Sequence, residues 1–241
     1  MDAPAPREMF ATTRWTLVLA AGQPGTPLAD EALESLCGTY WFPLYAYVRR
    51  RGYSREDAED LTQAFFVKLL GRRDFAGLGS DKGKFRAFLL ASLKHFLANE
   101  WDKSRCHKRG GSITHFSLDW QSADRQFQIA DGSEPSPDQA FDREWALALL
   151  ERVIHRLRGE AAADGKAARF EQLKDFLTVG KGAMRYGDKA SACGMDECAL
   201  RVAVHRLRKR YRELLRLEVA HTLTDPAMVD AELAVLLGAF G

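Results

Sequence analysis

The chain has 241 residues, of which 46% are hydrophobic and 28% charged. This length fits one large domain or two small ones, and the composition is that of a globular protein, so extensive disorder is excluded. No run of apolar residues approaches the roughly 18 that a membrane helix needs. Residues 1–6 lack the basic and apolar regions of a secretory signal, and four cysteines form no disulfide framework in a chain this long. We therefore expect a soluble cytoplasmic protein.

The net charge of +2 conceals a strong segregation of charge along the chain. Residues 49–110 carry 15 basic and 8 acidic groups, a balance of +7, and residues 181–216 carry 10 and 4, a balance of +6. Between them, residues 111–142 carry 1 basic and 6 acidic groups, a balance of −5. Residues 217–241 carry four acidic groups and no basic one. Two basic blocks separated by an acidic block indicate a polyanion that is contacted at two places.

Residues 30–109 are predicted to form a first helical domain. Apolar residues at spacings of three and four predict a helix over residues 32–51. A capping pattern at Ser54 begins a second helix, which buries one apolar stripe and ends at Gly71. A third helix begins near Phe85 and carries aromatic residues at helical spacing, with cations between them.

The rest of the chain is predicted to contain a linker and a second helical domain. Helical periodicity stops over residues 110–142, where Gly, Ser and Pro accumulate, so this acidic stretch is expected to be a linker. Periodicity returns over residues 143–216, and the last two helices there are separated by Gly194, which suits a left-handed turn, and Asp196, which can N-cap the second helix. This is the pattern of a helix-turn-helix hairpin.

The predicted fold class is therefore all-α, with two small helical domains joined by an acidic linker, the second a helix-turn-helix four-helix domain. Residues 1–29 and 217–241 are predicted to be extensions of this pattern. In the second extension, Pro226 can start a helix whose apolar residues Val229, Leu233, Leu236 and Phe240 need a partner surface. We expect this acidic helix either to fold back on the basic hairpin as a brake on DNA binding or to support the fold elsewhere.

The second helix of the hairpin separates an apolar stripe from a basic face. Leu200, Val204 and Leu207 recur at helical spacing and predict the buried side. A mostly basic opposite side is typical of a recognition helix, although a solvated basic helix is the alternative. The candidate DNA-binding residues of this helix are Glu197, Cys198, Arg201, His205, Arg206, Arg208 and Lys209.

The third helix of the first domain places cations beside aromatic rings. Most of its aromatic residues are expected to be core, but Trp101 leaves the core period, and His95 and Asn99 are polar positions away from the apolar stripe. Cations that follow a backbone, with planar groups that stack on unpaired bases, are what single-stranded DNA needs. The candidate single-strand-binding residues are Lys84, Arg86, Lys94, His95, Asn99 and Trp101.

Three segments, in this order, resemble the extracytoplasmic-function (ECF) group of bacterial RNA polymerase sigma factors, in the sigma-70 family. They are residues 53–66 (Tyr-Ser-Arg-Glu-Asp-Ala-Glu-Asp-Leu-Thr-Gln-Ala-Phe-Phe), residues 85–89 (Phe-Arg-Ala-Phe-Leu) and residues 200–211 (Leu-Arg-Val-Ala-Val-His-Arg-Leu-Arg-Lys-Arg-Tyr). The resemblance covers about residues 30–105 and 143–216. It departs from the family pattern at Lys189, Cys193 and His95.

The resemblance implies a role for each of these segments. The helix after Ser54 is implied to contact core RNA polymerase through Asp57, Glu59, Asp60, Gln63 and Phe66, although from the residues alone a solvated acidic turn is the alternative. The helix from Phe85 is implied to melt and read the minus-ten element, and the hairpin to read the minus-thirty-five element. Within the hairpin we expect Arg201 and His205 to contact bases, and Arg206, Arg208 and Lys209 to contact phosphates. The acidic linker is expected to thread through the polymerase interior, with a plain solvated tether as the alternative.

The implied partners are core RNA polymerase and promoter DNA, both as duplex and as melted single strand; an anti-sigma factor is a further partner that the family suggests. No cofactor, metal or membrane partner is expected. An enzyme is the first alternative, but the sequence has no phosphate-binding loop and no zinc-site spacing around Cys193 and Cys198. The second alternative is a helix-turn-helix regulator that binds an operator without being a polymerase subunit. That reading leaves the first domain without a role.

Overall fold

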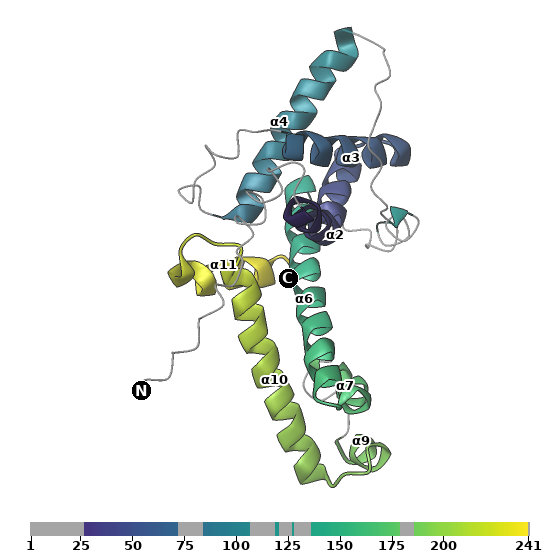
Figure 1. Cartoon of the computed structure of the whole chain (residues 1–241), viewed down its shortest axis with the longest axis vertical. Coiled ribbons are helices and arrows are strands. Elements are labelled where there is room, and N and C mark those ends of the chain that lie inside the picture. Colours follow the sequence, from purple (N-terminus) through teal and green to yellow (C-terminus); the bar gives the residue numbers. More distant parts are fainter. Residues whose placement is uncertain are drawn as a thin grey trace. The chain divides into compact units, whose positions relative to one another are not determined.

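The computed structural model describes residues 27–71, 84–106, 119–120, 127, 136–178 and 186–240 (Figure 1). Its helices are α2 (Pro27–Arg50), α3 (Arg55–Gly71), α4 (Phe85–Cys106), α6 (Pro137–Ala163), α7 (Ala167–Leu173), α8 (Asp175–Thr178), α9 (Tyr186–Ala192), α10 (Glu197–Ala220) and α11 (Val229–Gly238), with a 3-10 turn, η3 (Pro226–Met228), before α11. These described ranges contain no β-strand, so the predicted all-α fold class is confirmed. Within them, no helix combines the length and the apolar character that crossing a membrane requires.

The chain divides into two compact units. The first unit consists of residues 1–146 and 220–241, and the second of residues 147–219. One boundary falls inside α6 and the other at the end of α10. The C-terminal extension therefore belongs to the first unit. Most of the linker expected at residues 110–142 lies outside the described residues, as does most of the extension expected at residues 1–29, of which residues 27–29 begin α2.

An aromatic core holds the first unit together. Tyr40 of α2 stacks on Trp145 of α6 with their ring centroids 4.2 Å apart, and Phe85 of α4 lies 5.5 Å from the first ring and 5.9 Å from the second. Phe65 of α3 packs edge-on against Phe96 of α4 at 5.7 Å. Each large ring removes an area of about 150–250 Å² from water, so these pairs are a main source of the unit's stability. The apolar stripes predicted for α3 and α4 are thus confirmed at Ala58, Phe65, Leu69, Phe85, Leu89, Phe96 and Leu97.

Two residues of the predicted linker dock on α2. The ring of Trp120 lies edge-on to Trp41, with a centroid distance of 5.0 Å, and 5.7 Å from Tyr45. The guanidinium groups of Arg49 and Arg50 lie 4.8 and 5.0 Å from the ring centroid of Phe127. These stacking and cation–π contacts fix two points of the predicted linker on the first unit.

The second unit packs its helices around two apolar clusters that share Leu207. The first cluster contains Leu173, Phe176, Ala190, Leu200 and Val204, and the second contains Val153, Leu157, Phe170 and Leu214. Ion pairs cross between α6 and α10: the buried Glu218 meets Arg152 at 3.3 Å and Arg156 at 3.5 Å, and Glu160 meets Arg210 at 2.7 Å. The hydrogen bonds from Arg210 hold the pKa of Glu160 below its ordinary value.

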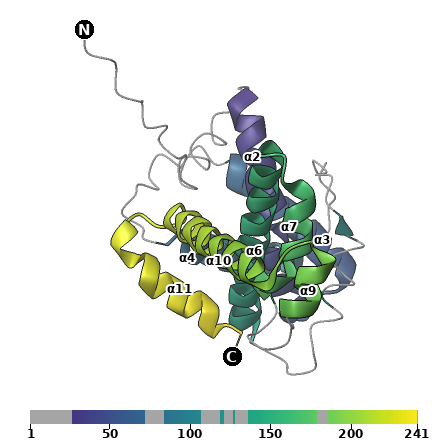
Figure 2. The same ribbon diagram turned by 90° about the horizontal axis from the view of Figure 1, so that it is seen from below.

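The predicted helix-turn-helix is confirmed in its local geometry. Gly194 has a φ of +63°, in the left-handed region where a side chain would be strained, and it comes two residues after the end of α9. Asp196 caps α10, because its Oδ1 accepts a hydrogen bond of 2.7 Å from the Ala199 amide. Lys189, one of the departures from the family pattern, stays partly exposed and places its Nζ 3.4 Å from an oxygen of Asp175. Figures 1 and 2 both show α9 beside the start of α10.

The C-terminal helix buries a different stripe from the one predicted. Asp225 caps η3 as expected, with its Oδ1 accepting from the Ala227 amide at 2.9 Å. Val229 and Leu236 are buried, but Glu232 is buried with them, while Leu233 is only partly buried and Phe240 is 44% exposed. A carboxylate therefore occupies the inward face where the sequence predicted only apolar side chains.

Candidate functional site

The outward face of α10 is a stripe of exposed side chains at spacings of three and four. It begins near the capped end of the helix with Cys198 and Arg201 and continues with Val202, His205 and Lys209, all exposed. The opposite side packs into the two clusters through Leu200, Val204 and Leu214. The predicted separation into a buried and a basic side is therefore confirmed, and we call the outward stripe the α10 face.

Arg201 is oriented by contacts within the hairpin. Its Nε lies 3.1 Å from Oε1 of Glu197, and its guanidinium carbon lies 5.0 Å from the centroid of the Tyr186 ring. Hydrogen bonding to Glu197 raises the pKa of Arg201, so the group stays charged. An Arg held by a ring and a carboxylate presents its remaining N–H groups in a fixed direction, as bidentate base recognition requires.

Arg208 differs from the other cations of α10. Its Nε and Nη2 donate hydrogen bonds of 3.0 and 2.8 Å to the backbone carbonyl of Phe176, in α8. The side chain is partly buried, unlike those of Arg206 and Lys209, which are exposed. Arg208 therefore ties α10 to α8 within the unit, and the expected phosphate contact does not match its position here.

The start of α3 presents an acidic surface. The predicted cap at Ser54 is confirmed: the Ser54 Oγ accepts from the Asp57 amide at 3.1 Å and donates to the Asp57 carboxylate at 2.8 Å. Glu59 pairs with Arg55 at 2.8 Å, and Asp57 and Asp60 are exposed. These carboxylates stand where the helix macrodipole is positive, which stabilises α3 and keeps an acidic face open to solvent.

Two residues expected on this acidic surface lie elsewhere. Gln63 is 5% exposed and Phe66 is 1% exposed, so both side chains are inside the first unit. Their neighbour Thr62 is buried too. The helix is covered on more than one side because it packs against both α2 and α4. Neither side chain is available for direct contact with a partner in this arrangement.

The candidate single-strand-binding residues of α4 fall into two groups, one at the start of the helix and one from its middle toward its end. At its start, Arg86 pairs with Asp142 of α6, and its Nε lies 3.0 Å from Oε1 of Glu232 in α11. Lys84, just before the helix, places its Nζ 2.6 Å from Oε2 of the same Glu232. In the second group, His95, Asn99 and Trp101 are exposed, the last by 56%.

A groove opens beside the second group. It has a volume of about 770 Å³ and is lined by Tyr47, Arg51, Gly52, Tyr53, Lys94, Leu97, Ala98, Trp101 and Asp138. Lys94 pairs with Asp138, and its Nζ lies 5.9 Å from the centroid of the Tyr47 ring. The hydrogen bond to Asp138 raises the pKa of Lys94. Burial raises the pKa of Tyr47, so its ring stays neutral. The groove thus combines aromatic rings with Arg51 and with the Lys94–Asp138 pair, which suits a planar base with a phosphate near Arg51.

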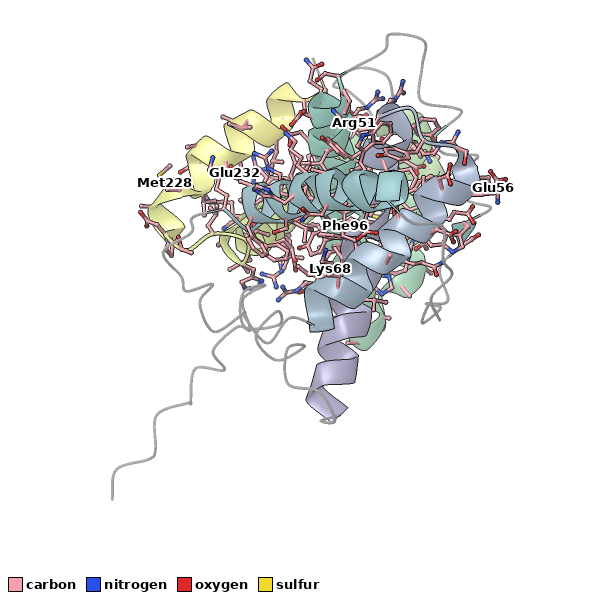
Figure 3. The ribbon with its side chains drawn as sticks, turned by 90° about the horizontal axis from the view of Figure 1, so that it is seen from above. Arg51, Glu56, Lys68, Phe96, Met228 and Glu232 are labelled. Atoms are coloured by element: carbon pink, nitrogen blue, oxygen red, sulfur yellow. The ribbon has the colours of Figure 1, made fainter. Side chains whose placement is uncertain are left out.

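The groove contains two residues that the sequence pattern missed. Arg51 and Tyr53 come from the turn after α2, at Gly52 with its φ of +91°. Figure 3 shows Arg51 near the end of α4 that carries the groove, and Glu232 near the other end. The exposed Val202 of the α10 face was missed as well, although its place four residues after Cys198 puts it on that stripe.

Within the described residues, no group of three His, Cys, Asp or Glu side chains is arranged to hold a metal ion. Cys193 and Cys198 are both free thiols, the first partly buried and the second exposed. No family model, curated protein or solved structure matches this chain.

Proposed function

We propose that this protein is a sigma factor that binds core RNA polymerase and directs promoter recognition and opening. The observation that carries the proposal is the α10 face: a capped, rigidly packed hairpin helix whose exposed side is basic and whose opposite side is core. This is the geometry with which a recognition helix enters a major groove.

In this proposal Arg201 and His205 read base edges of the minus-thirty-five element. Val202, exposed between them, contacts a thymine methyl group, for which an apolar side chain is suited. Arg206 and Lys209 contact phosphates, which position the helix without reading sequence.

The first unit supplies the other two activities in the proposal. The groove beside Trp101 receives an unpaired base of the melted minus-ten element, with Arg51 close to the accompanying phosphate. The acidic start of α3, with Asp57, Glu59 and Asp60, binds a basic surface of core polymerase. An operator-binding regulator would use the α10 face but would not need either of these surfaces.

The test is reconstitution of transcription. Purified full-length protein is mixed with core RNA polymerase, and complex formation is followed by size exclusion, with run-off transcription from genomic promoter libraries as the second readout. The proposal predicts a stable complex and promoter-dependent transcripts. Binding of duplex DNA without binding of core polymerase would reject it in favour of an operator-binding regulator.

A further inference from the structure

The C-terminal helix inserts a buried carboxylate between two cations at the start of α4. Glu232 is 1% exposed, and its two oxygens lie 2.6 Å from the Lys84 Nζ and 3.0 Å from the Arg86 Nε. Burial alone would raise the pKa of Glu232, but the two cations outweigh burial and lower it, so the group is charged at neutral pH. Figure 3 shows Glu232 of α11 beside this end of α4.

The start of α4 carries an excess of positive charge that favours a bound anion. The positive end of a helix macrodipole disfavours cations, yet α4 has no acidic residue in its first turn and has Lys84 and Arg86 there instead. An anion is therefore needed to offset the combined positive charge. In this structure the needed anion comes from the chain itself, through Glu232 and through Asp142 of α6.

The segment that carries Glu232 is attached to α4 by its backbone as well. The Phe85 amide donates a 2.9 Å hydrogen bond to the Thr222 carbonyl, and Lys84 forms an isolated antiparallel bridge with Leu223. These contacts bring the chain after α10 to the first turn of α4. From there, η3 and α11 lead to Glu232.

We propose that α11 is an internal competitor of nucleic acid. The carboxylate of Glu232 occupies a phosphate-binding site made by Lys84 and Arg86, and α11 must leave this site before a DNA backbone binds there. The inference rests on the proposed function, because its ligand is the single DNA strand that this function places along α4. In the free protein, Glu232 closes the part of that path at the start of α4.

The competing explanation is that Glu232 only stabilises the first unit. The two explanations differ in what nucleic acid does to α11. A competitor is displaced by DNA and, when its charge is removed, leaves Lys84 open to a phosphate and Arg86 paired with Asp142. A structural support is indifferent to DNA, and removing its charge frees no useful site.

The first experiment measures binding of a fluorescently labelled single-stranded oligothymidylate to the full chain at several salt concentrations. Glu232→Gln keeps the shape of the side chain and removes its charge; Glu56→Gln, exposed on α3, is the control with the same change in net charge. In both chains the bound strand meets the same cations once α11 has left, so the salt slope should change by less than the roughly 0.7 that one phosphate contributes on a single strand. The affinity at about 0.1 M salt should rise roughly tenfold in Glu232→Gln, because the strand no longer competes with a carboxylate. The control variant should not raise the affinity to a similar extent.

A coupled variant identifies the cation. Lys84→Gln should lower the salt slope by about 0.7 in either background, because a strand that displaces Glu232 contacts this lysine, and it should remove part of the gain in affinity in the Glu232→Gln background. Unchanged or weaker binding by Glu232→Gln overturns the inference.

The second experiment needs no variant and so does not depend on how well Glu232→Gln folds. Hydrogen exchange of the α11 amides is measured with and without the oligonucleotide. Faster exchange over residues 229–238 on adding DNA supports displacement, and unchanged or slower exchange overturns it. If the wild-type chain binds DNA with no change in α11, only the inference fails. If the chain binds neither the oligonucleotide nor core polymerase, the proposed function fails with it.

Discussion

Replacing Arg208 with Ala should destabilise the second unit rather than weaken DNA binding directly. The two hydrogen bonds from its guanidinium to the Phe176 carbonyl, at 3.0 and 2.8 Å, join α10 to α8. A hydrogen bond from a charged group contributes about 1.5–3 kcal/mol, and because the side chain is only partly buried and both bonds share one acceptor, we take about 1.5–2.5 kcal/mol for the pair. Lys209→Ala is the matched control, because the adjacent Lys209 is exposed and its removal changes the net charge equally. A surface change of this kind should stay within about 0.5 kcal/mol.

The two variants should also differ in how they bind DNA. Each is measured by urea unfolding and by the salt dependence of binding to a promoter duplex. Lys209→Ala should reduce the salt slope by about 0.9, the contribution of one phosphate contact on a duplex, and should leave the free energy of unfolding unchanged. Arg208→Ala should leave the slope unchanged and lower the free energy of unfolding. If Arg208→Ala instead matches Lys209→Ala in both measurements, Arg208 is a phosphate contact and its bond to α8 is unimportant.

Four other outcomes are expected. The double change Asp57→Arg with Asp60→Arg should abolish co-elution with core polymerase while circular dichroism stays helical; retained binding would exclude this face. Arg201→Ala should lose about 1–3 kcal/mol on a matched promoter and less on a mismatched one in binding titrations, whereas equal losses would make Arg201 a phosphate contact. Trp101→Ala should weaken oligothymidylate binding by about 1–3 kcal/mol through loss of one stacked base, and an unchanged affinity would remove the groove from the site. The pKa of Glu232 is lowered in the folded chain. The ionised carboxylate therefore contributes its full stabilisation above the ordinary glutamate pKa of about 4.3, and this stabilisation is lost as the pH falls through the lowered pKa. The difference in melting temperature between wild type and Glu232→Gln should therefore be constant above about pH 5 and shrink in more acidic buffer; a constant difference down to pH 3 would contradict the pairing.

Local signals in the sequence were sufficient to predict the hairpin and the start of α3. Ser54 with Asp57, and Gly194 with Asp196, specify a helix boundary through groups that lie three or fewer residues apart, so no distant part of the chain has to be known. The position of Arg208 beside the core could also have been predicted from local spacing. It comes four residues after the buried Val204, and residues four apart lie on the same side of a helix, so it lies next to the core rather than on the α10 face.

The burial of other side chains depends on contacts between segments that are distant in the sequence, so it could not be predicted from local patterns. The sequence of α3 predicted one buried stripe, and the burial of Gln63 and Phe66 requires a second neighbouring helix that a single helical pattern does not reveal. Glu232 is the clearest case. Helical spacing places Glu232 on the same side as Val229 and Leu236, but a charged side chain is expected to avoid the core. Its burial is favourable only because Arg86, 146 residues earlier, and Lys84 compensate its charge.

Pairing of this kind changes what the charge segregation means for function. The basic block over residues 49–110 has a balance of +7, but Lys84, Arg86 and Lys94 have carboxylate partners within the first unit that come from outside the block. Those carboxylates come from α6 and α11, which belong to the acidic stretches on either side of the second basic block. The acidic segments therefore cover part of the cationic surface as well as separating the two basic blocks. The residues of α4 most open to a nucleic acid are then His95, Asn99 and Trp101, which lie in its middle and second half. Beside them the groove provides a ring to stack on and Arg51 provides a charge.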